Sequence, residues 1–555
     1  MISKTIIEKI EKLLKDTIFK KYGIKSNKFV VDKTKDVKYG DFFSNIAMNL
    51  ASELKKNPLD LANEIKSVLK SDIIEKIDVA PPGYINIWLS DSTKANLLKT
   101  IIKEKDSYGQ FRPKNILYNI EFVSANPTGS LHIGHARNAA LGQTISNIWK
   151  KYGIKVDEEY YINDSGNQIN ILGMSVFYRY LELCGKSIKM EKDYYQGVEP
   201  INVAKLIYEK HKDKYASCKY DANKIEDKKV FDYFKTFSKN TLMEFIKKDL
   251  TDFRIRFDRY FQESKIYDMR LVEPTLKKLG KNVFEKDGAI WLKTTKYGDD
   301  KDRVMVKSDK TYTYFMPDIA YHNIKVSRKK GTTKIFNIWG ADHASYVERM
   351  TIALQCLGYK RNIMHVIVMQ MVKLTKDGQE FKMSKRSGNS LTLRDLIDAI
   401  GVESARWVLV SQAADSHIEI DVKKFQNESH DNNLFYVLYA YARINNILKK
   451  AKFKESKFKL TSVNLLKEQR EIELINMLFY YPHTIANISH SYDIQKLPMY
   501  LYNLANIFHS YYNDVKILES SSEELCNQRL NLILCIMHVI KSGLALFNIK
   551  PKGKI

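Results

Sequence analysis

The stretch NPTGSLHIGHARNAALG, residues 126–142, decides how the middle of this chain folds. It follows NILYNIEFVSA, residues 115–125, whose apolar and β-branched side chains predict a strand. From residue 133 the apolar residues recur with a helical period, and the pattern stops at Gly153. IKVDEEYYIND, residues 154–164, then predicts another strand. Strand, glycine-containing loop, helix and strand in this order predict a βαβ unit with a parallel sheet.

Two histidines stand where the predicted helix begins. If the helix starts near Ile133, then His132 and His135 share one face of its first turn, beside free backbone N–H groups and the positive end of the helix dipole. Such a helix start attracts phosphate. Gly129 and Gly134 leave room for a nucleotide to come close. A surface helix with two chance histidines is the alternative for this motif taken alone.

A second motif, FKMSKRSGN at residues 381–389, favours the phosphate interpretation. It follows a DG dipeptide that predicts a hairpin turn. It precedes TLRD, residues 392–395, a capping box that opens another helix. Lys382 and Lys385 are therefore expected on an exposed loop, suited to closing over a polyphosphate and neutralising its leaving group. A pair of lysines in a lysine-rich chain is usually surface decoration, but the upstream histidines make that interpretation weaker here.

Composition restricts the partners and the setting. A chain of 555 residues exceeds the size of one hydrophobic core, so two to four domains are expected. The 90 Lys and Arg against 65 Asp and Glu leave a charge of +25, which favours a polyanionic partner, most often nucleic acid, over a merely solvated lysine-rich surface. The five cysteines form no CxxC pair and predict reduced thiols in a cytoplasmic protein. The apolar stretch LNLILCIMHVI is about half the length that spans a bilayer, so we expect no membrane segment.

Three regions follow one another along the chain. Residues 1–110 have the pattern of a small α/β module, and residues 111–402 contain the predicted parallel sheet. A stretch rich in Lys and Tyr at about residues 185–230 is too long for an ordinary loop and predicts an insertion in the sheet domain. Residues 403–555 are helical almost throughout, which predicts a C-terminal bundle.

The two motifs resemble a known family. HIGH and KMSKR are similar to the two signatures of class I aminoacyl-tRNA synthetases. EFVSANPTGSLHIGHARNAALG, YYINDSGNQ, WGADH and the long segment DGAIWLKTTKYGDDKDRVMVKSDKTYTYFMPDIAYH resemble the arginyl-tRNA synthetase family specifically. The resemblance runs from GDFFSNIAMNLA to LYNLANIFHSYY and so covers nearly the whole chain.

The resemblance implies a fold, a reaction and partners. The fold is α/β: a Rossmann-type parallel-sheet catalytic domain at residues 111–402, an N-terminal α/β additional domain at 1–110 that contacts the tRNA elbow, and an all-helical anticodon-binding domain at 403–555. The reaction is activation of arginine by ATP to arginyl-adenylate and pyrophosphate, followed by transfer to the 3′ end of tRNA. The partners are arginine, its tRNA, and ATP with Mg²⁺. The family's default is a monomer. We expect no metal site in the protein itself.

Positions that match the family's motifs carry expected roles in the phosphate chemistry. His132 and His135 would hold the ATP phosphates near the transition state, while Lys382 and Lys385 would stabilise the departing pyrophosphate. Asp342 would accept from the ribose hydroxyls. The full set of residues expected to bind ATP is His132, Gly134, His135, Gly340, Asp342, Lys382 and Lys385.

The arginine side chain is a guanidinium fork, which requires a carboxylate in a shaped pocket. Asp318 matches the family's guanidinium partner, and Tyr314, one helical turn earlier, would form a wall of the pocket. The other residues expected to frame the amino acid are Glu121, Ser124, Asn126 and His132.

A helix near residue 433 carries aromatic side chains at near-helical spacing, namely Phe435, Tyr436, Tyr439 and Tyr441. They fill a core, or part of their face lines the anticodon loop as the resemblance implies.

Two other functions share part of this pattern. A small-molecule nucleotidyltransferase has an HxGH loop and the same attack on an α-phosphate, but needs neither flanking region. A non-catalytic tRNA-binding paralogue would be expected to have lost a histidine or a lysine of the signatures, and all four are present.

Overall fold

A computed structural model describes residues 2, 4–329, 331–376, 378–380, 391–426, 432–453 and 460–553. The chain divides into two compact units. Unit 1 comprises Met1–Pro113, Lys151–Gly153 and Asn427–Ile555, and unit 2 comprises Lys114–Lys150 and Ile154–Gln426.

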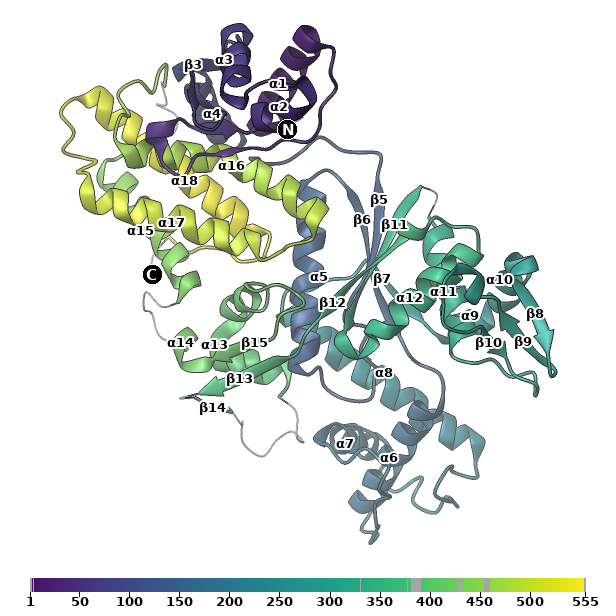
Figure 1. Cartoon of the computed structure of the whole chain (residues 1–555). Helices are drawn as coiled ribbons and strands as arrows, with labels where there is room; N and C mark the ends of the chain where they lie inside the picture. Colours follow the sequence, from purple (N-terminus) through teal and green to yellow (C-terminus); the bar gives the residue numbers. More distant parts are fainter. Residues whose placement is uncertain are drawn as a thin grey trace. The chain divides into compact units, whose positions relative to one another are not determined.

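Unit 2 is built around a five-stranded parallel sheet in the order β12-β11-β5-β6-β7 (Figure 1). Its strands are β5 (Leu117–Glu121), β6 (Lys155–Ile162), β7 (Arg259–Gln262), β11 (Thr332–Gly340) and β12 (Met364–Met369). The predicted βαβ unit is confirmed as β5, α5 (Ile133–Lys151) and β6. The strand order reverses between β5 and β11. Because ligands of open parallel sheets bind at the carboxyl ends of the strands beside such a reversal, the fold directs attention to the residues that follow these two strands.

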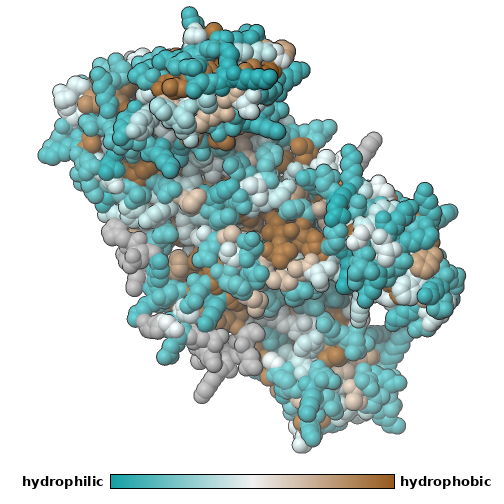
Figure 2. Space-filling model, in the orientation of Figure 1, coloured by the Kyte–Doolittle hydropathy of each residue, from teal (hydrophilic) through white to brown (hydrophobic). Residues whose placement is uncertain are grey.

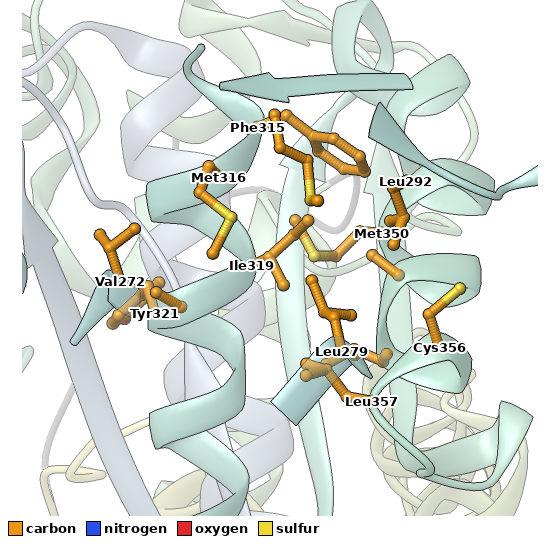
Figure 3. Packing of buried hydrophobic residues seen from close by; sticks show 14 of the residues in the cluster. Val272, Leu279, Leu292, Phe315, Met316, Ile319, Tyr321, Met350, Cys356 and Leu357 are labelled. Atoms are coloured by element: carbon orange, nitrogen blue, oxygen red, sulfur yellow. The ribbon is translucent and has the colours of Figure 1, made fainter. Parts of the chain in front are cut away.

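Helices cover both faces of this sheet. In Figure 1, α5 lies on one side, and α11 (Phe315–Ser327) and α12 (Ala344–Cys356) lie on the other. Gly142 lets α5 press against the end of β5, since a Cβ there would come within 2.2 Å of the Phe122 ring. On the opposite face, Met316 and Ile319 of α11 pack with Met350 of α12 in a buried apolar cluster (Figure 3).

Two insertions separate the strands of unit 2. The first contains three helices with an apolar core of their own: α6 (Asn167–Leu183), α7 (Val198–His211) and α8 (Lys228–Asp252). The insertion expected at residues 185–230 corresponds to its middle part. The second contains the helices α9 (Ser264–Asp268) and α10 (Val272–Leu279). It also contains an antiparallel sheet in the order β10-β9-β8, with β8 (Val283–Lys286), β9 (Ala289–Leu292) and β10 (Arg303–Val306).

The last part of unit 2 differs from the expected helical bundle beginning at residue 403. Its elements are β13 (Val372–Lys376), β14 (Gln379–Glu380), α13 (Leu393–Val408), β15 (Ile418–Asp421) and α14 (Val422–Gln426). Residues 403–426 belong to unit 2 because β15 pairs in parallel with β13. The expectation failed here because β15 is a strand of four residues between helices, whose alternating burial is a weak sequence signal. The predicted hairpin before the lysine motif is confirmed by the antiparallel pairing of β13 with β14.

Unit 1 joins segments from both ends of the chain. Its N-terminal strands form an antiparallel sheet in the order β1-β2-β4-β3, with β1 (Val31–Lys33), β2 (Phe42–Ser44), β3 (Ile74–Ala80) and β4 (Tyr84–Leu89). The helices of this part are α1 (Ile6–Tyr22), α2 (Ile46–Leu54), α3 (Pro58–Val68) and α4 (Asp91–Glu104). Its described C-terminal residues form the helices α15 (Asn433–Lys450), α16 (Gln469–Ser491), α17 (Lys496–Asp514) and α18 (Glu523–Ala545). Helix α4 packs on α18, and the Tyr108 hydroxyl donates to the Leu478 carbonyl at 3.0 Å. Among the helices of the described ranges, none is both long and apolar enough to cross a membrane.

Candidate active site

The end of β5 carries a buried carboxylate. Glu121 Oε1 accepts from Ser124 Oγ at 3.1 Å, and Oε2 accepts from Tyr321 Oη at 3.0 Å and from Lys325 Nζ at 2.8 Å. Burial alone would raise the pKa of Glu121, but the buried Lys325 ammonium and His322 hold it below its ordinary value. Both carboxylate oxygens are therefore engaged within the protein.

The chain after β5 is held in a strained turn. Val123 and Ser124 have positive φ angles of 69° and 43°. This conformation is rare for a β-branched residue and is typical of functional sites. The Val123 N–H donates to Asn138 Oδ1 at 2.7 Å, and Ser124 Oγ accepts from the Tyr161 N–H at 3.0 Å. Asn126 then donates through Nδ2 to Gln168 Oε1 at 2.8 Å, which ties the loop to the start of α6.

The two histidines lie at the start of α5, as the sequence predicts. Their rings stack with centroids 3.7 Å apart. His132 Nδ1 accepts from the Gly134 N–H at 3.1 Å, and His135 Nδ1 accepts from the His132 N–H at 3.3 Å. Because each Nδ1 accepts, each neutral ring carries its proton on Nε2. Burial, followed by the nearby His132, lowers the pKa of His135 to about 3, so His135 is neutral at physiological pH and offers one N–H donor.

The expectation of free backbone N–H groups in this first turn is wrong for two residues. The Ile133 N–H donates to the Leu391 carbonyl at 3.0 Å, and the Gly134 N–H is used by His132. Gly134 is required for a different reason from the one expected, since a Cβ there would come within 2.8 Å of the His132 ring. A Cβ on Gly129 would meet no atom within 4 Å, so there is space beside the loop at that position.

The end of β11 lies at the other side of the strand reversal. Gly340 is the last residue of β11, and a Cβ on it would come within 2.4 Å of the Asp342 carboxylate. The Asp342 side chain is 77% exposed and lies 3.3 Å from His343 Nε2. Its carboxylate is therefore accessible to a ligand.

Hydrophobic side chains on the face drawn in Figure 2 gather over the strands of this parallel sheet, surrounded by hydrophilic ones.

Asp318 on α11 is a partly buried carboxylate on which the negative charges of Glu263 and Glu121 act. Its Oδ2 accepts from the Tyr346 hydroxyl at 2.7 Å. Burial, together with the negative charges of Glu263 and Glu121, raises its pKa to about 7, against the lowering effect of the Tyr346 bond. A carboxylate so destabilised in its ionised form gains most from a cationic ligand.

Glu263 is a functional candidate that the sequence patterns missed. It directly follows β7, and its carboxylate accepts from the Tyr161 hydroxyl at 2.9 Å and from Ser165 Oγ at 2.5 Å. Its negative charge contributes to the raised pKa of Asp318. An acid directly after a parallel strand is the signal that would have indicated it, but the sequence analysis expected no strand at residues 259–262.

Tyr314, expected as a wall of the arginine site, immediately precedes α11, and its side chain is 92% exposed. Tyr346 of α12 contacts Asp318 instead. Lys382 and Lys385 lie outside the described residues.

Comparison with known proteins identifies similarity along the whole chain. Residues 2–89 match the family model of the arginyl tRNA synthetase N terminal domain, residues 97–430 match the class I (R) tRNA synthetase catalytic domain, and residues 437–555 match the DALR anticodon binding domain. An arginine–tRNA ligase of Malacoplasma penetrans is 63% identical over 100% of this chain and 99% of its own length. One from Ureaplasma parvum is 43% identical over 99% of each chain.

A solved structure shares the fold. A Campylobacter jejuni protein described as an arginyl-tRNA synthetase superposes with a TM-score of 0.77 at 33% sequence identity, covering 84% of this chain and 100% of its own.

Proposed function

Because the chain belongs to the arginyl-tRNA synthetase family, we propose that the ends of β5 and β11 bind arginine and ATP in the orientation that the family's reaction requires. That reaction is the function of this enzyme: it activates arginine with ATP to arginyl-adenylate, releases pyrophosphate, and transfers arginine to the 3′ end of its tRNA. The matches extend over both flanking regions, which a small-molecule nucleotidyltransferase does not need.

The arginine guanidinium occupies the space between Asp318 and Glu263. The position of Asp318 beside the Tyr346 hydroxyl, together with a pKa raised by burial and by the charge of Glu263, supports this assignment. A cation placed there relieves the repulsion between the two carboxylates. The carboxylate oxygens can also accept the paired N–H groups of a guanidinium. Ser124 and Asn126 frame the amino-acid end. Glu121 acts indirectly by holding Ser124 through its hydrogen bond, since Lys325 already neutralises it.

ATP lies along the start of α5 and the end of β11. The Nε2–H groups of His132 and His135 donate to the phosphates, with Gly134 allowing the two rings to stack. The exposed Asp342 carboxylate accepts from the ribose hydroxyls beside Gly340. Lys382 and Lys385 retain their proposed role in stabilising pyrophosphate. Little covalent chemistry is required of the protein, so positioning and charge stabilisation dominate.

Magnesium enters with ATP in this proposal. Mg²⁺ usually keeps several waters and binds through substrate phosphates with one or two carboxylates. Within the described part of the chain, no three His, Cys, Asp or Glu side chains form a group suited to a metal ion. The ion's chemistry is to neutralise phosphate charge; the residues named above orient the nucleotide around it.

The tRNA is bound by unit 1. A cleft of about 500 Å³ opens between α15 and residues 515–519. The Arg443 guanidinium lies 4.5 Å from the Tyr439 ring centre and 4.7 Å from that of Tyr512. Unpaired bases stack on aromatic and guanidinium planes, so this cleft is our proposed anticodon contact. We therefore assign the anticodon-binding domain to the helices from α15 onward, instead of to residues 403–555. Residues 1–110 contact the tRNA elbow in this proposal. The catalytic domain comprises residues 111–402 and extends through α14.

The enzyme acts as a cytoplasmic monomer in this proposal. The test of the whole proposal is exchange of labelled pyrophosphate into ATP with each amino acid in turn, with and without bulk tRNA. Arginine should be the one amino acid that supports exchange. Exchange with another amino acid in place of arginine would contradict the proposed pocket.

The arginine pocket predicts a pH dependence. Free Asp318 has a pKa of about 7 because of burial and the neighbouring carboxylates, and only its ionised form pairs with guanidinium. As the pH falls through about 7, protonation removes the binding form, so kcat/KM for arginine should decline by about tenfold per pH unit. At saturating arginine, kcat should decline less, because the bound cation lowers the pKa. Steady-state exchange kinetics check this, and a kcat/KM that stays level below pH 7 would exclude a titrating carboxylate.

A further inference from the structure

Arg137 is a buried arginine two residues beyond His135 on α5. Its side chain is 0% exposed. Nη1 donates to the carbonyls of Gln370 at 2.7 Å and Ser416 at 2.8 Å, and Nη2 donates to the carbonyl of Ala413 at 2.7 Å. Burial lowers its pKa to about 10, so the guanidinium stays charged at neutral pH. A charge buried against three main-chain carbonyls is costly to desolvate unless all three bonds form together.

The three carbonyls mark the base of one small sheet. Gln370 lies two residues before the start of β13, and Ser416 and Ala413 lie in the segment that leads into β15. The Gln370 N–H donates to the Ala414 carbonyl at 2.9 Å, and the Ile418 N–H donates to the Met371 carbonyl at 3.2 Å. The bonds of Arg137 therefore hold the point at which β13 and β15 begin to pair.

The first turn of α5 is also hydrogen-bonded to residues 391–393, which follow the sheet strand β14 in the chain. The Leu393 N–H donates to the Leu131 carbonyl at 2.7 Å, and the Ile133 N–H donates to the Leu391 carbonyl at 3.0 Å. His132 and Thr392, which lie between these two hydrogen-bonded pairs, form an isolated antiparallel β-bridge. The histidine turn thus contacts the chain at both residue 370, through Arg137, and residues 391–393.

We propose that Arg137 is a positioning residue for adenylation, which sets the distance between the histidine turn of α5 and the strand β13. This inference rests on the proposed role of His132 and His135 as phosphate donors. Reacting groups must be held closely, and a displacement of about 1 Å can reduce the rate about a hundredfold. Lysine cannot replace arginine here, because one ammonium cannot span three carbonyls that a planar fork reaches.

The test compares Arg137→Lys and Arg137→Met with the control Arg406→Met. Arg406 is likewise buried in unit 2, 1% exposed, and donates through Nη1 to the Phe253 carbonyl at 2.7 Å. All variants lose bonds from a buried guanidinium, so all are expected to melt earlier. Rates are divided by the folded fraction, measured by near-UV circular dichroism. For Arg137→Lys we expect kcat of pyrophosphate exchange to fall about a hundredfold while KM for arginine changes less than about threefold.

Arg406→Met should keep the parental kcat per folded molecule. Parental kcat in Arg137→Lys, an equal loss in Arg406→Met, or a raised KM for arginine with kcat retained would each overturn the proposal. Failure of the proposed function itself is distinguishable, because the parent enzyme would then show no arginine-dependent exchange before any variant is compared.

Discussion

Replacing Asp318 by alanine is expected to lower arginine-dependent pyrophosphate exchange by a factor of hundreds to thousands. The substitution leaves the ligand's guanidinium without its charge partner in a desolvated pocket, and a broken buried ion pair costs about 3 to 5 kcal/mol. At about 1.4 kcal/mol per tenfold, this corresponds to the expected loss in kcat/KM. ATP binding should persist, since its contacts are assigned to α5 and to the end of β11.

The matched control is Asp299→Ala. Asp299 is another largely buried carboxylate of unit 2, 8% exposed and 2.7 Å from Arg303, so its loss affects stability without removing a pocket group. Glu263→Gln should weaken arginine use in the same direction as Asp318→Ala, since the proposed site places the guanidinium between these two carboxylates. Lysine should remain a poor substrate for the parent enzyme. Its ammonium cannot reach all the carboxylate oxygens that a planar guanidinium pairs with, so some acceptors stay unpaired. Parental arginine kinetics in Asp318→Ala would require the pocket to be redrawn.

Replacing His135 by alanine is expected to reduce the adenylation rate by about 2.7 to 4 kcal/mol of transition-state stabilisation, roughly a hundredfold to a thousandfold. The neutral imidazole donates from Nε2, since Nδ1 accepts the His132 N–H. In the proposed role, that donor acts on charge that develops as the α-phosphate reacts, so kcat should fall while KM for arginine changes little.

Two amide variants test the assigned tautomer. Glutamine at position 135 can place an N–H near the former Nε2, whereas asparagine can replace only Nδ1, so His135→Gln should retain more activity than His135→Asn. His211→Ala on α7 serves as the control; that histidine is bonded to Tyr233 at 2.9 Å in the helical insertion. Equal activity of the alanine variant and the parent in single-turnover adenylation would remove His135 from the reaction.

The small sheet before α14 illustrates where local pattern was insufficient. β15 has only four residues, of which Ile418 and Ile420 are buried, and its partner β13 lies more than forty residues earlier. Nothing within that short segment indicates a strand until β13 is beside it. The boundary expected at residue 403 therefore fell within unit 2. The opposite case is the capping box at Thr392, which is confirmed because its hydrogen bonds span only three residues.

The sequence by itself determined the βαβ unit, the histidine turn and the family resemblance. Each depends on residues close together in the chain: side-chain periodicity, helix-start residues and contiguous motifs express local backbone preferences. Only the tertiary structure decided that the charge of Glu263 acts on Asp318, that Lys325 neutralises Glu121, and that the Tyr346 hydroxyl donates to Asp318. Burial and the charges of groups distant in sequence control these interactions, and neither exists until the strands and helices pack against one another.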